Sequence, residues 1–204
     1  DGYRRLLEIQ EHPCAPDWNY TVGDRLVGED LSGVEEFRTA LRQSGAPSEA
    51  PPAEMLAWIQ RMRRTVPLFQ KNLQEGFDLQ RDWAYVPTTC REDIALRIED
   101  VVPLDADTSR LIVYDTSGVT GHAILVPHHP QAMAKYHPLL ERVLEFYGIN
   151  LQFSHNVTAC LNVGCQVSTV TFANVFSVWN QAGFAKVNLH ERVWDREKAR
   201  RFFN

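Results

Sequence analysis

Two helix-like patterns of apolar residues flank a polar break in the first third of the chain. Their members recur at the spacing of one helix face: Val34, Phe37 and Leu41, then Met55, Leu56, Ile59 and Met62. The segment 44–52 between the two patterns is small, polar and rich in proline, as linkers and long loops are. The chain is therefore predicted to divide into an N-terminal helical and loop region with its linker, 1–52, and an α/β region, 53–204.

Strand-like and helix-like segments alternate in the second half of the chain. The runs 110–114, 122–126 and 184–189 are β-prone, whereas 131–147 and 168–181 carry the apolar residues of helices. Strands that alternate with long helices favour a layered arrangement in which helices cover a sheet. The predicted fold class is therefore α/β, with a mainly parallel sheet flanked by helices.

Two of the predicted helices carry signals at an end. The helix over 131–147 is amphipathic, and Gly148 is suited to end it. A last helix is predicted over 196–203, with Asp195 as its N-cap. The apolar residues of the first of these helices lie on one stripe: Met133, Tyr136, Leu140, Val143, Leu144 and Tyr147.

Composition and charge exclude several classes of partner. The chain has 204 residues, 44% of them hydrophobic, and a formal net charge of −5, so a nucleic acid is not expected as a partner. No apolar run approaches the roughly 20 residues of a membrane-spanning helix. Residues 1–5 are not followed by a hydrophobic stretch, so a signal peptide is not expected. Four cysteines without a Cys-x-x-Cys pair are typical of a reduced protein, so we expect a cytoplasmic location and no membrane partner. Because the first residue is Asp1, we expect a piece of a longer chain.

The loop over 115–121 lies between two β-prone runs and is rich in glycine and hydroxyl groups. Gly118 and Gly121 allow positive φ, so the backbone can turn sharply and point several N–H groups into one concavity that suits anionic oxygens. Hydroxyl donors are added by Thr116, Ser117 and Thr120. A phosphate-binding loop and an ordinary β-hairpin turn are both consistent with this pattern.

The loop resembles the phosphate-binding motif of the adenylate-forming superfamily, which includes acyl-CoA synthetases and the adenylation domains of peptide synthetases. The segment 116–121 matches the first six positions of that motif at five residues, Thr116, Ser117, Gly118, Thr120 and Gly121, and differs from it at Val119. Two segments before the loop, 64–69 and 86–94, are similar in order and spacing to the phenylacetate-CoA ligase-like branch. The resemblance covers about 64–190 and implies part of the large N-terminal domain of such an enzyme.

The resemblance implies ATP-dependent activation of a small carboxylic acid. The acid would form an acyl- or aryl-adenylate with ATP and Mg²⁺, and then a thioester with coenzyme A. Residues 116–121 would hold the ATP phosphates, and the acyl pocket would be lined by Phe172, Phe176 and Trp179. No catalytic residue or metal ligand is assigned to this chain. They are expected in a remaining C-terminal part of the enzyme, so the 204 residues alone are expected to be inactive. A homodimer is a further expectation.

Two departures from the motif keep other functions open. Val119 replaces a hydroxyl residue inside the loop, and His122 begins a segment that lacks the lysine usual after the motif. These changes favour a non-catalytic or diverged α/β binding module. The other alternative is an adenylating enzyme of a biosynthetic pathway that transfers the acyl group to an acceptor other than coenzyme A.

A zinc site is the weaker interpretation of one further group of residues. His155, Cys160 and Cys165 are spaced five apart, but this is not the spacing of a zinc finger or knuckle, and a fourth ligand is not evident. Buried cysteines acting as small apolar side chains explain the pattern better. No metal ligand is therefore predicted.

Overall fold

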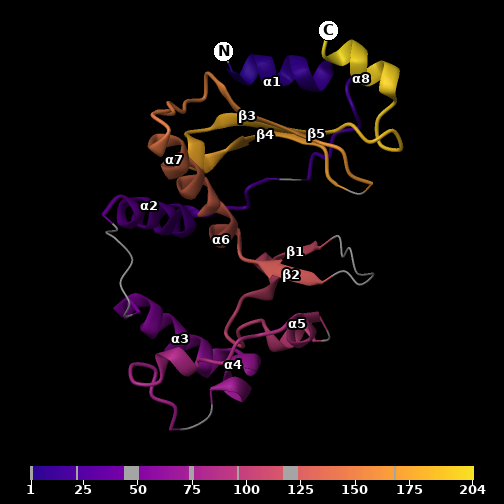
Figure 1. Ribbon diagram of the computed structural model, residues 1–204. Helices are drawn as coiled ribbons and strands as arrows, with labels where there is room; N and C mark the ends of the chain where they lie inside the picture. The colour runs from indigo at the N-terminus through magenta and orange to yellow at the C-terminus, as the bar shows by residue number, and fades with distance from the viewer. Residues whose placement is uncertain are drawn as a thin grey trace. The chain divides into compact units, whose positions relative to one another are not determined.

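The computed structural model describes residues 2–21, 23–43, 51–73, 76–95, 97–116, 124–167 and 169–204 (Figure 1). These residues form a mixed α/β protein, which confirms the α/β part of the predicted fold class. The chain divides into two compact units. Unit 1 comprises Asp1–Arg42 and Ala134–Asn204, and unit 2 comprises Gln43–Met133. Unit 1 therefore joins segments from both sides of the linker predicted at 44–52.

A three-stranded mixed sheet forms the middle of unit 1. Its order is β3-β5-β4, and the central β5 is parallel to β3 and antiparallel to β4. The elements of the unit in chain order are α1 (Gly2–Glu11), α2 (Gly28–Gln43), α7 (Tyr136–Phe146), β3 (Thr158–Gly164), β4 (Phe172–Phe176), the 3₁₀ turn η4 (Ser177–Trp179), β5 (Ala182–Asn188) and α8 (Arg196–Phe202).

Helices cover both faces of this sheet. Side chains alternate between the faces along β5. Ala185 packs with Leu6 of α1, and Val187 packs with residues of α8. On the opposite face, Ala182 packs with Val34 of α2. Figure 1 shows the result: α1 and α8 lie on one face of the sheet, and α2 and α7 lie on the other.

Unit 2 consists of short helices and one hairpin. Its elements are α3 (Ala53–Thr65), α4 (Pro67–Asn72), η1 (Trp83–Tyr85), α5 (Arg91–Ala95), η2 (Ile98–Asp100), η3 (Thr108–Arg110), β1 (Ile112–Asp115) and β2 (Leu125–His128). A core cluster of Ile59, Leu73 and Leu79 joins α3 to the segments after α4, and these side chains are at most 5% exposed. The strands β1 and β2 are antiparallel, and they confirm two of the predicted strands within a few residues.

Local signals set the ends of the helices. The Asp195 carboxylate accepts a hydrogen bond of 2.9 Å from the amide of Lys198, which confirms the predicted N-cap of α8. Gly148 follows α7 with a φ of 75°, a conformation that favours glycine, and confirms the predicted stop. Both signals are contained in a few neighbouring residues, so they could be recognised without knowing the fold.

The helix predicted over 131–147 is interrupted and forms α6 (Pro130–Ala134) and α7. Pro138 has no amide proton and cannot donate to the carbonyl of Ala134, four residues earlier. The His137 ring takes this place, with its Nδ1 2.9 Å from the Ala134 oxygen. One proline near the start of α7 therefore accounts for the break.

Two predictions about the sheet are wrong for the described residues. In place of the helix predicted over 168–181 the chain forms β4 and η4, because its β-branched and aromatic residues suit a strand within a covered sheet. The sheet is not mainly parallel, since β3 and β5 are the one parallel pair among the described strands. The connection 177–181 between β4 and β5 is too short for the crossover that parallel neighbours require. The strand β3 was not predicted.

Candidate functional site

The predicted phosphate loop is closed at its base by the hairpin of unit 2. The last ladder pair is Asp115 with Leu125. One step further, the amide of Thr116 donates to the carbonyl of Ile124 at 3.0 Å, and the amide of Ile124 donates to Thr116 Oγ1 at 3.0 Å. The other loop residues of the prediction lie outside the described part of the chain: Ser117, Gly118, Val119, Thr120 and Gly121.

This closure limits what Thr116 can offer to a phosphate. Its amide is used within the hairpin, so it does not contribute to a concavity of free N–H groups. Its hydroxyl oxygen accepts from Ile124, which leaves the hydroxyl proton available for donation to another oxygen. A hairpin therefore frames the loop, and phosphate binding by residues 117–121 stays a prediction.

The residues predicted to line an acyl pocket lie together in unit 1, on β4 and η4. The ring centroids of Phe172 and Phe176 are 6.5 Å apart, and those of Phe176 and Trp179 are 6.2 Å apart. Phe184 of β5 stacks on Phe172 at 5.5 Å, and Phe153 stacks on Trp179 at 4.9 Å. Trp179 is only 2% exposed. The three predicted residues therefore belong to an aromatic core between the sheet and the α2 and α7 helices.

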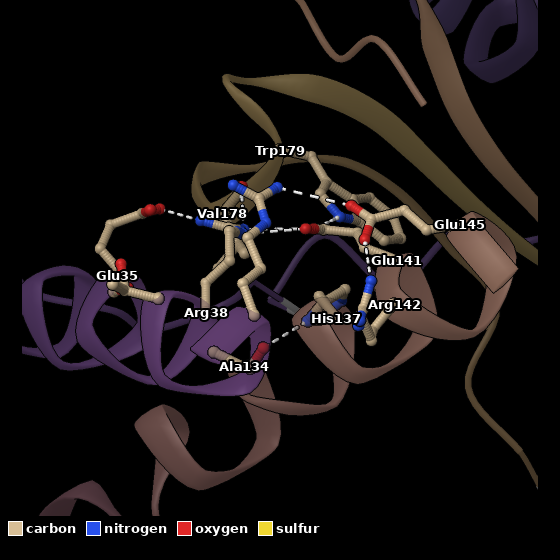
Figure 2. Close-up of polar contacts among 11 residues, drawn as sticks. Glu35, Arg38, Ala134, His137, Glu141, Arg142, Glu145, Val178 and Trp179 are labelled. Atoms are coloured by element: carbon tan, nitrogen blue, oxygen red, sulfur yellow. Dashed lines mark hydrogen bonds and ion pairs between the residues drawn. The ribbon is translucent and has the colours of Figure 1, made fainter. Parts of the chain in front are cut away.

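A cluster of charged residues joins α2 to α7 beside this aromatic core, and the sequence analysis did not identify it. Figure 2 shows how the labelled members of this cluster face one another. We call it the α2–α7 charge cluster, and its members are Glu35, Arg38, Arg42, Glu141, Arg142 and Glu145. The spacing of four between Arg38 and Arg42, and between Glu141 and Glu145, was visible in the sequence. Their pairing was not, because the partners are 103 positions apart.

Arg38 and Glu141 are the centre of the α2–α7 charge cluster. Arg38 Nε donates to Glu141 Oε2 at 2.8 Å, and Arg38 Nη2 donates to Glu141 Oε1 at 3.1 Å. The indole Nε1 of Trp179 donates to the same Oε1 at 3.0 Å. Arg38 also donates to a Glu35 carboxylate oxygen and to the Val178 carbonyl, the latter at 3.4 Å. The guanidinium thus links α2, α7 and η4 (Figure 2).

Hydrogen bonding keeps this arginine charged and burial keeps the nearby histidine neutral. Burial alone would lower the pKa of Arg38, but hydrogen bonds to Glu141 and Glu35 outweigh it and raise the pKa above its ordinary value. Burial lowers the pKa of His137, whose ring meets Trp179 edge-on at 4.5 Å between centroids. Because the Ala134 carbonyl can only accept, Nδ1 of His137 carries the proton of the neutral ring.

A cleft of about 450 Å³ opens beside the α2–α7 charge cluster. The other lining residues come from the segment before β3 and from η4 and the turn after it: Leu151, Gln152, Phe153, Val178 and Asn180. Each charged member of the cluster forms an ion pair with an oppositely charged member. The arrangement therefore holds α2, α7 and η4 together and presents no uncompensated charge to a ligand.

The structure does not assemble the residues of the zinc interpretation. Within the described ranges, no three His, Cys, Asp or Glu side chains are grouped closely enough to hold a metal ion, His155, Cys160 and Cys165 included. All four cysteines are free thiols. Burial raises the pKa of the Cys160 thiol, as expected for a cysteine that packs as an apolar side chain. The interpretation as a buried cysteine is wrong for Cys165, which is exposed. In the same ranges no helix has the length and apolar character to cross a membrane.

Comparison of the chain with protein-family models, with curated proteins and with solved structures finds no match. The functional proposal therefore depends on the residues of the loop, on the motif they resemble and on the hairpin that carries them.

Proposed function

We propose that this chain is the phosphate-binding part of an enzyme that activates a small carboxylic acid with ATP. The observation that supports the proposal most is the motif from Thr116 to Gly121, which lies between the paired strands β1 and β2. A hairpin fixes the direction in which such a loop leaves the protein. It thereby gives the glycine-containing motif a base of two paired strands.

The chemistry suits a loop of this composition. The carboxylate attacks the α-phosphate of ATP, the acyl-adenylate forms and pyrophosphate leaves. A thiol such as that of coenzyme A then takes the acyl group and releases AMP. Such transfers depend on positioning and on neutralising phosphate charge rather than on a protein nucleophile. Amide and hydroxyl donors of residues 116–121, together with Mg²⁺, would neutralise that charge.

One finding favours the alternative of a diverged binding module. The amide of Thr116 is used by Ile124, so the loop has one N–H fewer for phosphate than the motif alone suggests. Val119 removes a hydroxyl donor from the same loop. A loop weakened in this way is consistent with binding an anion without catalysis, or with an adenylating enzyme that uses an acceptor other than coenzyme A.

Titration calorimetry with MgATP on the 204-residue chain tests the phosphate assignment. We expect binding by the unchanged chain and its loss in Gly121→Val, because a β-branched residue opposes the positive φ predicted there. Thr108→Val is the matched control: Thr108 is exposed, precedes β1, and lies outside the motif. No binding at millimolar MgATP, or equal binding by both variants, would remove the nucleotide assignment.

A second measurement concerns catalysis by the chain alone. We expect no acid-dependent exchange between ATP and pyrophosphate, because the catalytic and metal-binding residues are expected in the remaining part of the enzyme. Robust exchange would show that the 204 residues are sufficient and would contradict the expected inactivity.

A further inference from the structure

A second cavity of unit 1 lies where the parallel strands β3 and β5 end. Cys165 directly follows β3, and Leu189, His190 and Glu191 directly follow β5. Because β3 and β5 are parallel, the segments that follow them leave the sheet at the same end of the strands. Ligands of open α/β sheets commonly bind beyond the carboxyl ends of the strands. The cavity has a volume of about 460 Å³, within the range of roughly 300–1,000 Å³ of small-molecule sites.

A fully buried asparagine holds the two chain segments that form one wall of this cavity. Asn188, the last residue of β5, is 0% exposed. Its Oδ1 accepts hydrogen bonds from the amides of Gln166 at 3.0 Å and His190 at 3.1 Å. Its Nδ2 donates to the Gln166 carbonyl at 2.7 Å. The segments after β3 and β5 are therefore fixed relative to each other, and the wall exists without a ligand.

One side of the helix α8 forms the opposite wall. Its contributing residues recur three and four positions apart: Arg196, Ala199, Arg200 and, just after the helix, Phe203. Phe203 contacts Trp194 with 5.9 Å between ring centroids, which holds the aromatic ring beside the cavity. Phe203 and Leu189 nevertheless remain 48% and 40% exposed. The cavity thus has apolar walls that are open to water.

Two arginines on consecutive turns of α8 give the cavity a positive rim. The lining contains two arginines, Arg196 and Arg200, and one carboxylate, Glu191, so these three side chains together carry one net positive charge. The side chain of Arg196 has no ion pair or hydrogen bond with another residue in the ranges that the structure describes. Arg200 shares the Glu197 carboxylate, at 3.7 Å, with Arg201. The rim can therefore accept one further negative charge.

We infer that this cavity binds a small organic monocarboxylate with an apolar body. The carboxylate would accept hydrogen bonds from Arg196 and Arg200, and the apolar body would cover Leu189, Ala199 and Phe203. A polyphosphate fits the cavity less well, because its walls are apolar and its net charge is small. The site belongs to unit 1 and does not depend on phosphate binding by residues 116–121 in unit 2.

Protection of Cys165 from alkylation tests the site on the unchanged chain. Cys165 lines the cavity and is exposed, whereas Cys90 is exposed in unit 2 and serves as an internal control. We expect saturating 2-naphthoate to slow the reaction of Cys165 with iodoacetamide several-fold and to leave Cys90 unchanged, as followed by peptide mass spectrometry. Acetate and 2-naphthalenemethanol, which lack the apolar body and the charge respectively, should protect little. Absence of protection at millimolar 2-naphthoate, or equal protection by the neutral alcohol, overturns the inference.

Substitutions on α8 locate the charge contact. Arg196→Gln and Arg200→Gln are each expected to weaken 2-naphthoate binding about tenfold, the loss of one charge-assisted contact. Arg201→Gln is the matched control, because Arg201 lies on the same helix outside the cavity lining. Unchanged affinity in both lining variants contradicts the site. If a glutamine variant does not fold, as judged by circular dichroism, Arg196→Lys takes its place because it keeps the charge. The alkylation comparison on the unchanged chain then decides whether the cavity binds 2-naphthoate.

Discussion

Arg38 of α2 contacts the inner face of α7 through two hydrogen bonds to Glu141. The side chain of Arg38 is only 15% exposed, and that of Glu141 is only 12% exposed. Removing one member of a buried ion pair leaves a charge without compensation, which costs about 3–5 kcal/mol when burial is complete. The Trp179 indole would still donate to Glu141, and some water reaches both groups. The expected cost at this site is therefore somewhat lower.

We expect Arg38→Met to lower the free energy of unfolding by about 2–4 kcal/mol, measured by urea denaturation. The double variant Arg38→Met with Glu141→Leu should recover a large part of this loss, since it removes both charges. Arg42→Met is the matched control on the same helix, because Arg42 is 60% exposed and lies 3.5 Å from Glu145. Exposed pairs contribute about 0–1 kcal/mol. Equal losses in Arg38→Met and Arg42→Met would contradict the central position of Arg38.

At the scale of elements, four of the six residues of the apolar stripe predicted over 131–147 are exposed, whereas Met133 and Leu144 are half-buried. Tyr136, Leu140, Val143 and Tyr147 are 59%, 46%, 51% and 77% exposed. The opposite side of the helix carries the Glu141 carboxylate, which faces Arg38 and Trp179. A hydrophobic stripe predicts that a helix is amphipathic, but it does not identify what lies against the stripe. Here the polar side of the helix packs in unit 1.

This orientation predicts that changes on the stripe have little effect on stability. Leu140→Gln and Val143→Gln should each change the free energy of unfolding by less than about 0.5 kcal/mol, as surface substitutions do. Val34→Ala, at a position only 1% exposed, should cost about 2 kcal/mol. Chemical denaturation of the three variants makes the comparison. A loss in Leu140→Gln as large as that in Val34→Ala would show that the stripe is buried in solution.

Local sequence signals were sufficient for some elements and insufficient for others. The cap at Asp195 and the stop at Gly148 depend on neighbouring residues, and both predictions are confirmed. The segment 168–181 is apolar on most faces. A buried strand and a buried helix both have this pattern, so periodicity could not distinguish a strand from a helix here. The same limit applies to function. A loop motif is contiguous and can be recognised, whereas the contact of Arg38 with Glu141 requires the fold.

At the scale of the whole chain, unit 1 is assembled from two separated segments. Leu6 of α1 packs with Ala185 on one face of the sheet, and Val34 of α2 packs with Ala182 on the other. The core of unit 2 around Ile59 lies entirely within one continuous segment. Sequence composition indicates a linker but not which segments associate across it. Truncation therefore has different expected effects under the two possible divisions of the chain. One division is the predicted boundary between 1–52 and 53–204, and the other is the division into unit 1 and unit 2.

Removal of residues 1–52 distinguishes the two divisions. The sheet of unit 1 would lose α1 from one face and α2 from the other, exposing apolar residues of β4 and β5 to water. We therefore expect peptides from β3, β4 and β5 to lose protection from hydrogen exchange in the chain 53–204, while peptides from α3 and α4 keep theirs. The full chain measured in parallel is the reference, and added peptide 1–43 should restore part of the protection. If β5 stays protected without residues 1–52, the segment 53–204 folds as a domain by itself, and α1 and α2 are additions to it rather than parts of its core.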